Sequence, residues 1–65
     1  MADGQKATLT VRRPGQDITV ELQYHHEKWF VIYSVDEDGG QAKLTDIERA
    51  NLKARARRGE DETGR

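Results

Sequence analysis

Two stretches near the start of the chain, residues 6–13 and 17–24, alternate apolar and polar side chains with a period of two. Such alternation is typical of strands with one buried face. Between them, Pro14 presets φ and Gly15 tolerates a positive φ, as a type II turn requires. The pattern predicts an antiparallel hairpin with a loop of about four residues. The side chains expected to form its inward face are Leu9, Val11, Ile18, Val20 and Leu22.

The next stretch, residues 28–35, is apolar on both faces. A strand of this kind is usually covered on both faces or lies centrally in its sheet. We expect it to be the third strand of a meander, ended by the acidic turn at residues 36–40. We assign one face to the core, and it consists of Trp29, Val31, Tyr33 and Val35. We assign the other face, with Phe30 and Ile32, to contact with a partner or a second copy of the chain.

A helix is expected near the end of the chain because its start and stop signals are both present. Thr45 and Glu48 match a capping box, in which the hydroxyl caps the Glu48 amide and the carboxylate reaches back. Acidic residues near its start and basic residues near its end suit the helix dipole. Gly59 stands where a residue with left-handed backbone conformation commonly ends a helix.

The helix has a narrow apolar stripe when its residues are placed at about 100° intervals. This stripe consists of Leu44, Ile47, Ala50 and Ala54, and we expect it to lie on the sheet, with Leu44 and Ile47 in the core. Leu52 and Ala56 fall on the other side, among charged residues. They are expected to be exposed, either singly or as part of a partner surface.

These elements predict an α+β fold, a three-stranded antiparallel meander with one C-terminal helix packed on a sheet face. Residues 1–58 would form a single small domain, and residues 59–65 a flexible charged tail. Residues 1–5, short, polar and terminal, are expected to be disordered.

The chain has 65 residues and no cysteine. A domain this small buries only about 60% of the surface that its unfolded chain exposes, so oligomerisation or a partner is expected to add stability. The N-terminus lacks the apolar region of a signal peptide. The longest apolar run, Trp29–Tyr33, is too short to cross a bilayer. These features predict a cytoplasmic protein without membrane contact.

The charge is unevenly distributed, although the formal net charge is only −1. Acidic residues dominate residues 1–42 and basic residues dominate residues 43–58. Arg49, Lys53 and Arg57 on the helix could contact a protein partner. Together with Arg12 and Arg13 they could instead neutralise phosphates of a nucleic acid. The sequence pI of about 6.1 and the acidic cluster at residues 60–62 favour the protein partner.

Residues suited to catalysis are scarce. Ser34 is the only serine, and it lies in the middle of a predicted strand. His25 and His26 could serve as bases, but no strained turn presents the serine to them. The chain is also too short to enclose a substrate in a pocket of the usual ~300–1,000 Å³. We therefore expect no enzymatic activity and no cofactor.

Two motifs with metal-binding residues also fall short of a site. Adjacent His25 and His26 would point to opposite faces of a strand, and a structural zinc site needs four ligands. The acidic run starting at Asp36 resembles the opening of a calcium loop. However, its sixth position is Gln41 rather than glycine, and its twelfth is Ile47 rather than glutamate. The sequence predicts no metal site.

The order of LTVRRPGQDITVELQY, FVIYSVDEDGG and LTDIERANLKARA resembles a loose group of small proteins encoded by tailed bacteriophages and prophages. The similarity covers residues 7–57 and consists of the pattern of elements. The resemblance implies binding to a host protein and disabling it, for example a polymerase, a nucleoid protein or a CRISPR effector. It supplies no functional residue, because the group has no shared functional motif.

The sequence thus favours a non-catalytic protein-binding module, a phage or prophage accessory protein that modulates a host protein. Its expected contact residues are Phe30, Ile32, Arg49, Lys53 and Arg57. The alternative is a nucleic-acid-binding protein that uses Arg12, Arg13, Arg49, Lys53 and Arg57. A homodimer through the second face of the third strand is compatible with either.

Overall fold

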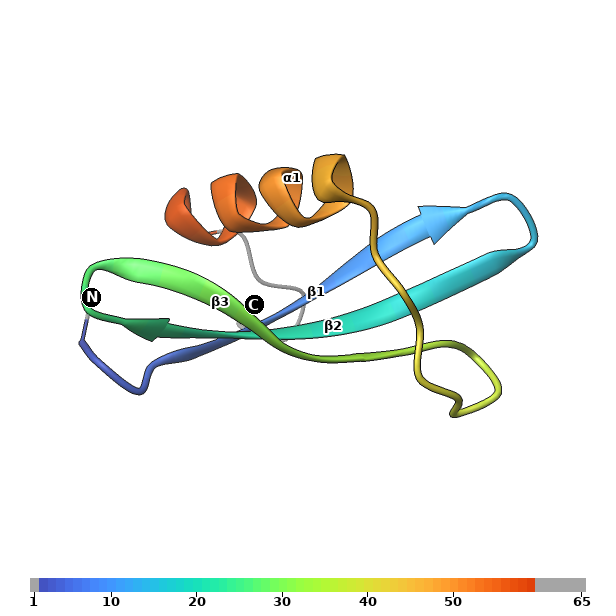
Figure 1. Ribbon diagram of the computed structural model, residues 1–65, viewed down its shortest axis with the longest axis horizontal. Helices are drawn as coiled ribbons and strands as arrows, with labels where there is room; N and C mark the ends of the chain where they lie inside the picture. Colours follow the sequence, from blue (N-terminus) through green and yellow to red (C-terminus); the bar gives the residue numbers. More distant parts are fainter. Residues whose placement is uncertain (1, 60–65) are drawn as a thin grey trace.

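The computed structural model describes residues 2–59 and has the α+β architecture expected from the sequence (Figure 1). Three antiparallel strands form one sheet in the order β1-β2-β3, and one helix packs across a face of it. No helix in this part of the chain is long and apolar enough to cross a membrane. The predicted tail lies outside the described residues, except for Gly59. The elements are β1 (Lys6–Arg13), β2 (Gln16–His25), β3 (Lys28–Val35) and α1 (Asp46–Arg57).

The first hairpin is tighter than the sequence suggested. β1 and β2 pair regularly up to Arg13 and Gln16, so the loop contains only Pro14 and Gly15 rather than about four residues. Gly15 has a φ of 75°, the positive value expected of it. The regular register keeps the alternating apolar residues of both strands on one face, where they form the floor of the core.

The second hairpin has a strained two-residue loop. His26 and Glu27 connect β2 to β3 with φ values of 50° and 65°. Such loops normally contain asparagine and glycine, because other residues resist a left-handed backbone. The conformation costs a non-glycine residue about 1–2 kcal/mol. This loop therefore stores strain at one end of β3.

The N-terminal residues are ordered, which makes the expectation of disorder wrong for residues 2–5. The Gly4 amide donates to the Tyr24 carbonyl, and the Tyr24 amide donates to the Gln5 carbonyl, both at 2.8 Å. The Asp3 carboxylate accepts from the His26 amide at 3.2 Å. These contacts involve mainly backbone groups, so the polar composition of the segment does not reveal them.

A bulge in β3 changes which of its side chains face the core. Val31 pairs with Leu22, and Tyr33 pairs with Glu21, so Ile32 is an additional residue in β3. An extra residue reverses the alternation of every later side chain. Tyr33, predicted to lie in the core, is consequently 57% exposed.

The core lies between the sheet and α1. Val11, Val31 and Leu44 pack against it and are partly buried, as expected, whereas Val35 is half-buried outside it. The buried residues are Ala7, Leu9, Ile18, Val20, Leu22, Trp29, Leu52 and Ala56.

The helix turns a different face to the sheet from the one predicted. Leu52 and Ala56 are buried, whereas Ile47 is 74% exposed. Glu48 lies one turn before Leu52 on the same face, and Arg55 lies beside Ala56. Both charged side chains find partners on neighbouring segments, so they share the inward face with the apolar pair. The prediction was wrong because it treated every charge as facing solvent.

Candidate functional site

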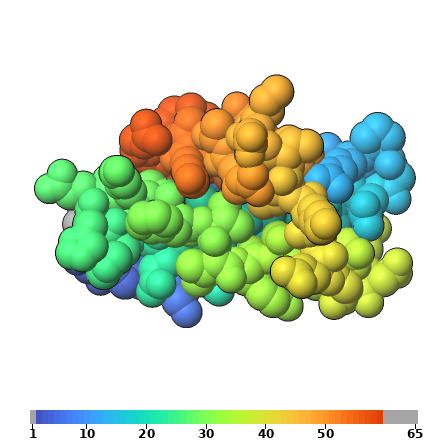
Figure 2. All heavy atoms as spheres, in the orientation of Figure 1, coloured from blue at the N-terminus to red at the C-terminus, as the bar shows by residue number. Residues whose placement is uncertain are grey.

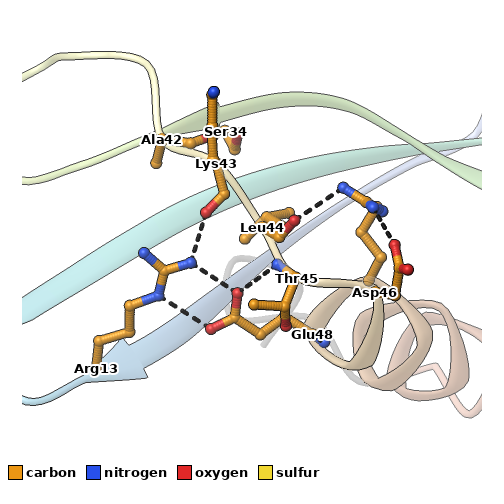
Figure 3. Close-up of polar contacts among 9 residues, drawn as sticks. Arg13, Ser34, Ala42, Lys43, Leu44, Thr45, Asp46 and Glu48 are labelled. Carbon is orange, nitrogen blue, oxygen red and sulfur yellow. Dashed lines mark hydrogen bonds and ion pairs between the residues drawn. The ribbon is translucent and has the colours of Figure 1, made fainter.

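The start of α1 is fixed by the predicted capping box and by an arginine from β1 (Figure 3). The Thr45 hydroxyl accepts from the Glu48 amide at 3.1 Å, and Glu48 Oε1 accepts from the Thr45 amide at 2.9 Å. Arg13 donates to both oxygens of Glu48, through Nε at 3.0 Å and Nη2 at 2.7 Å. Arg13 Nη2 also donates to the Lys43 carbonyl at 2.5 Å. This two-pronged contact joins the end of β1 to the first turn of α1.

The same contacts shift the ionisation of both partners. The hydrogen bond from Arg13 is the main cause that lowers the pKa of Glu48 from 4.5 to about 2, followed by the hydrogen bond from the Thr45 amide. The hydrogen bond to Glu48 raises the pKa of Arg13 above its ordinary value. Both groups are therefore charged at neutral pH, and Arg13 is engaged within the protein.

A second arginine attaches the middle of α1 to the same side of the sheet. Arg55 Nη1 donates to the Thr10 carbonyl of β1 at 3.0 Å. Thr10 and Thr19 form a non-hydrogen-bonded pair, counting from the pair Arg13 and Gln16 at the hairpin loop, so the Thr10 carbonyl points away from β2 at the edge of the sheet. Arg13 and Arg55 together close the side of α1 that faces β1.

The opposite edge of the sheet, along β3, is closed over only part of its length. The segment after the acidic turn runs back beside the end of β3, where Gln41 forms a bridge with Val35. The Ala42 amide donates to the Ser34 carbonyl at 3.2 Å, and the Ser34 hydroxyl donates to the Ala42 carbonyl at 2.6 Å. The Asp36 amide donates to the Gly40 carbonyl at 2.9 Å. The chain thus covers its own edge at residues 34–36.

The first half of β3 remains an open edge. A two-residue hairpin loop is flanked by a hydrogen-bonded pair, here His25 and Lys28, and bonded and non-bonded pairs then alternate along an antiparallel ladder. By this count Trp29 and Val31 direct their amide and carbonyl groups away from β2. Among residues 2–59 no backbone hydrogen bond pairs these groups with another segment.

Two hollows lie along this open edge, beneath α1. Figure 2 views the molecule from the β3 side, with the green side chains of β3 below the orange and red side chains of α1. One hollow has a volume of about 430 Å³ and the other about 380 Å³. We call the two together the β3–α1 groove. The first is lined by Glu27, Lys28, Trp29, Phe30, Lys53 and Arg57, and the second by Val31, Ile32, Tyr33, Ser34, Gln41, Ala42, Lys43, Leu44 and Arg49.

The β3–α1 groove combines positive charge with exposed apolar surface. Glu27 is the single acidic residue in its lining, against several lysines and arginines. Phe30 and Ile32 are 46% and 45% exposed, and Tyr33 continues the same apolar row. Trp29 is buried at its floor, with its Nε1 donor lacking an acceptor in the described part of the chain. Such a mixture is suited to an anionic partner that also has apolar side chains.

All five residues predicted to contact a partner lie along this groove. Phe30, Lys53 and Arg57 line the first hollow, and Ile32 and Arg49 line the second. The Arg49 guanidinium donates to the Leu44 carbonyl and to Asp46, which holds it beside the second hollow. Sequence patterns placed the strand residues and the helix residues separately, and the fold places them side by side.

The groove also contains residues that were not predicted to contact a partner, among them Glu27, Lys28, Trp29 and Lys43. Lys28 and Glu27 flank the start of an apolar strand, which is the signal that could have identified them. Trp29 was assigned to the core, and it has that role as well.

The arginines proposed for nucleic acid are distributed differently. Arg13 is held by Glu48, as described above. Arg12 is exposed and lies opposite Asp17 in the β1–β2 ladder. Neither lines the β3–α1 groove, in which Arg49, Lys53 and Arg57 lie.

The residues considered for catalysis do not come together. His25 pairs with Lys28 at the start of the β2–β3 ladder, whereas Ser34 pairs with Val20 near its end. Five residues of β2 separate the two positions, or about 17 Å. In the described range, no group of three or more histidine, aspartate and glutamate side chains is arranged to hold a metal ion.

Comparisons of the chain with models of protein families, with curated proteins and with solved structures found no significant match.

Proposed function

We propose that this protein is a non-catalytic protein-binding module whose contact surface is the β3–α1 groove. The observation that supports this is the juxtaposition, along one open strand edge, of exposed apolar side chains and two helix cations, Lys53 and Arg57, that form no ion pair within residues 2–59. Aromatic and arginine side chains are the residues most enriched at binding hot spots. Phe30 and Arg57 line the same hollow.

The resemblance to small phage and prophage proteins adds the identity of the partner to this proposal. In that setting the partner is a protein of a bacterial host. It is bound in the cytoplasm, and binding alone, without a catalysed reaction, changes its activity. The groove brings together the cations and apolar side chains of two elements, which suits binding to a protein surface.

Nucleic acid is the alternative partner, and the placement of the arginines favours it less. Phosphate binding needs several cations that can contact the same backbone. Arg13 is committed to Glu48, and Arg12 lies outside the groove that contains Lys53 and Arg57. The remaining cations are interleaved with apolar residues of β3, an arrangement more suited to a protein surface.

The test is an affinity capture from bacterial lysate with the full chain as bait, before and after nuclease treatment. The groove variant is Phe30→Ala/Lys53→Glu/Arg57→Glu. The matched control is Lys6→Glu/Arg12→Glu, which reverses two exposed charges outside the groove. Circular dichroism verifies that both variants are folded.

We expect one protein to be retained by the wild type and the control after nuclease treatment, and to be lost with the groove variant. Retention of nucleic acid alone, released by moderate salt and reduced in the control variant, would overturn the proposal. That outcome would support the nucleic-acid alternative, because phosphate contacts weaken steeply as salt rises.

A further inference from the structure

We infer that the β3–α1 groove binds an extended acidic segment of its partner, which adds as a fourth strand to the open edge of β3 at residues 29–31. This inference rests on the proposed function and specifies how the partner binds and what its chemistry is.

The backbone of β3 provides the first argument. Trp29 and Val31 direct amide and carbonyl groups to the open edge, and no segment among residues 2–59 pairs with them there. Further along, the segment around Gln41 already covers the edge at Val35 in an antiparallel bridge. Unpaired edge groups are a template for another strand, and edge addition is a recurrent mode of peptide recognition. The edge therefore offers a place for a short extended segment and no more.

Charge provides the second argument, and it selects an acidic segment. Lys28, Lys53 and Arg57 line one hollow against Glu27 alone. Lys43 and Arg49 line the other, whose lining has no acidic residue, although Arg49 also forms an ion pair with Asp46 outside it. Within the described range, neither Lys53 nor Arg57 forms an ion pair with an acidic side chain. Carboxylates entering the groove would meet these cations at close range.

The spacing of the helix cations matches the spacing of an extended chain. Arg49, Lys53 and Arg57 recur every four residues, which is about 6 Å along a helix. Alternate side chains of a strand are about 6.8 Å apart and point to the same face. In Figure 1, α1 lies lengthwise over the sheet. Its cations follow the order of the hollows along β3, since Arg57 lines the same hollow as Phe30, and Arg49 the same hollow as Ile32. Successive acidic side chains of an added strand can therefore reach successive helix cations.

A second copy of this chain fits the groove less well. Pairing of two β3 edges would bring Lys28, Lys53 and Arg57 of one copy close to the same cations of the other, in a groove with little negative charge. Like charges facing one another oppose association. The acidic segment of a different protein avoids this repulsion.

The test titrates a synthetic eight-residue peptide of alternating glutamate and valine into the full chain. Trp29 is the only tryptophan and lines the groove, so its fluorescence reports binding there. Two further peptides have backbone N-methyl groups on either the first or the second set of alternate residues. Only one set can donate to β3 in an added strand. A peptide with glutamine in place of glutamate tests the charge requirement.

We expect one methylated peptide to lose at least tenfold in affinity and the other to bind as the parent does. The glutamine peptide should also lose at least tenfold, as should the parent peptide with Lys53→Glu/Arg57→Glu protein. Lys6→Glu/Arg12→Glu should bind unchanged.

Equal affinity of both methylated peptides would overturn strand addition, and unchanged affinity of the glutamine peptide would overturn the acidic requirement. A concentration-dependent dimer in sedimentation that blocks the peptide, or stronger binding of single-stranded oligo-dT in the groove, would assign the groove to another occupant. The proposed function would stand without this inference if the lysate protein were still lost with the groove variant. If neither the peptide nor the lysate protein depended on the groove residues, the inference and the proposed function would both be overturned.

Discussion

The two long sides of α1 use their arginines and lysines in opposite ways. On the side of β1, Arg13 and Arg55 donate to Glu48 and to the Thr10 carbonyl, and so attach the helix to the sheet. On the side of β3, Lys53 and Arg57 line an open hollow and have no acidic partner within residues 2–59. One side of the helix is closed by its own contacts and the other borders an open hollow.

This difference shows that the role of a basic residue depends on what the opposing element offers. β1 presents its own arginine and a free carbonyl to the helix, whereas the start of β3 presents apolar side chains and more positive charge. Substitutions on the β1 side should therefore change stability and spare binding. Substitutions of the cations on the β3 side, Lys53 and Arg57, should change binding and spare stability.

The largest expected effect on stability is at Leu52, which is buried between the helix and the sheet. Leu52→Ala should lower the free energy of unfolding by about 2–5 kcal/mol, because it leaves a cavity in the centre of a small core. Urea unfolding followed by Trp29 fluorescence measures the change. Ile47→Ala, on the exposed face, is the control and should change stability by less than about 0.5 kcal/mol. Equal effects at the two positions would contradict the observed rotation of α1.

A smaller effect is expected on the closed side, at the helix cap. Thr45→Ala removes the hydroxyl that accepts from the Glu48 amide, and should cost about 1 kcal/mol of stability. The same variant should bind the acidic peptide as the wild type does, since Thr45 is not in the lining of the groove. A loss of peptide affinity in the folded variant would show that the two sides are coupled.

On the open side, a substitution in the strained loop should change both stability and affinity for the acidic peptide. Glu27→Gly replaces a residue at φ 65° with one that adopts this conformation freely, and should raise stability by about 0.5–1 kcal/mol. It also removes the single acid of the groove lining, so affinity for the acidic peptide should rise roughly twofold. Urea unfolding and the fluorescence titration measure the two effects. Destabilisation would show that the loop is not under strain.

The most gradual expected effect is a pH dependence of stability that arises from Glu48 on the closed side. The pKa of Glu48 is lowered from 4.5 to about 2, so the folded state favours its ionised form. Its contribution to stability is complete above pH 4.5 and is lost as the pH falls from there towards 2. The difference in Tm between wild type and Glu48→Gln should therefore shrink over this interval. A difference that stays constant down to pH 2 would show that Arg13 does not act through the charge of Glu48.

The sequence by itself determined the elements, because each depends on residues close together in the chain. Period-two alternation identified the strands, the positive φ of Gly15 was anticipated, and the capping box of Thr45 and Glu48 located the start of the helix. Gly59 has the expected left-handed conformation, with a φ of 83°. The five predicted contact residues were also chosen from local patterns, by exposure and charge.

Only the tertiary structure decided which faces these elements present to one another. An extra residue at Ile32 reversed the alternation in β3 and turned Tyr33 outward, which a strict period of two cannot anticipate. The contact of Arg13 with Glu48, 35 residues apart, accompanies the rotation of α1 that buries Leu52 instead of Ile47. Pairings between distant residues and a single inserted residue leave little trace in the local pattern. The closed side, the open edge and the groove between β3 and α1 all follow from them.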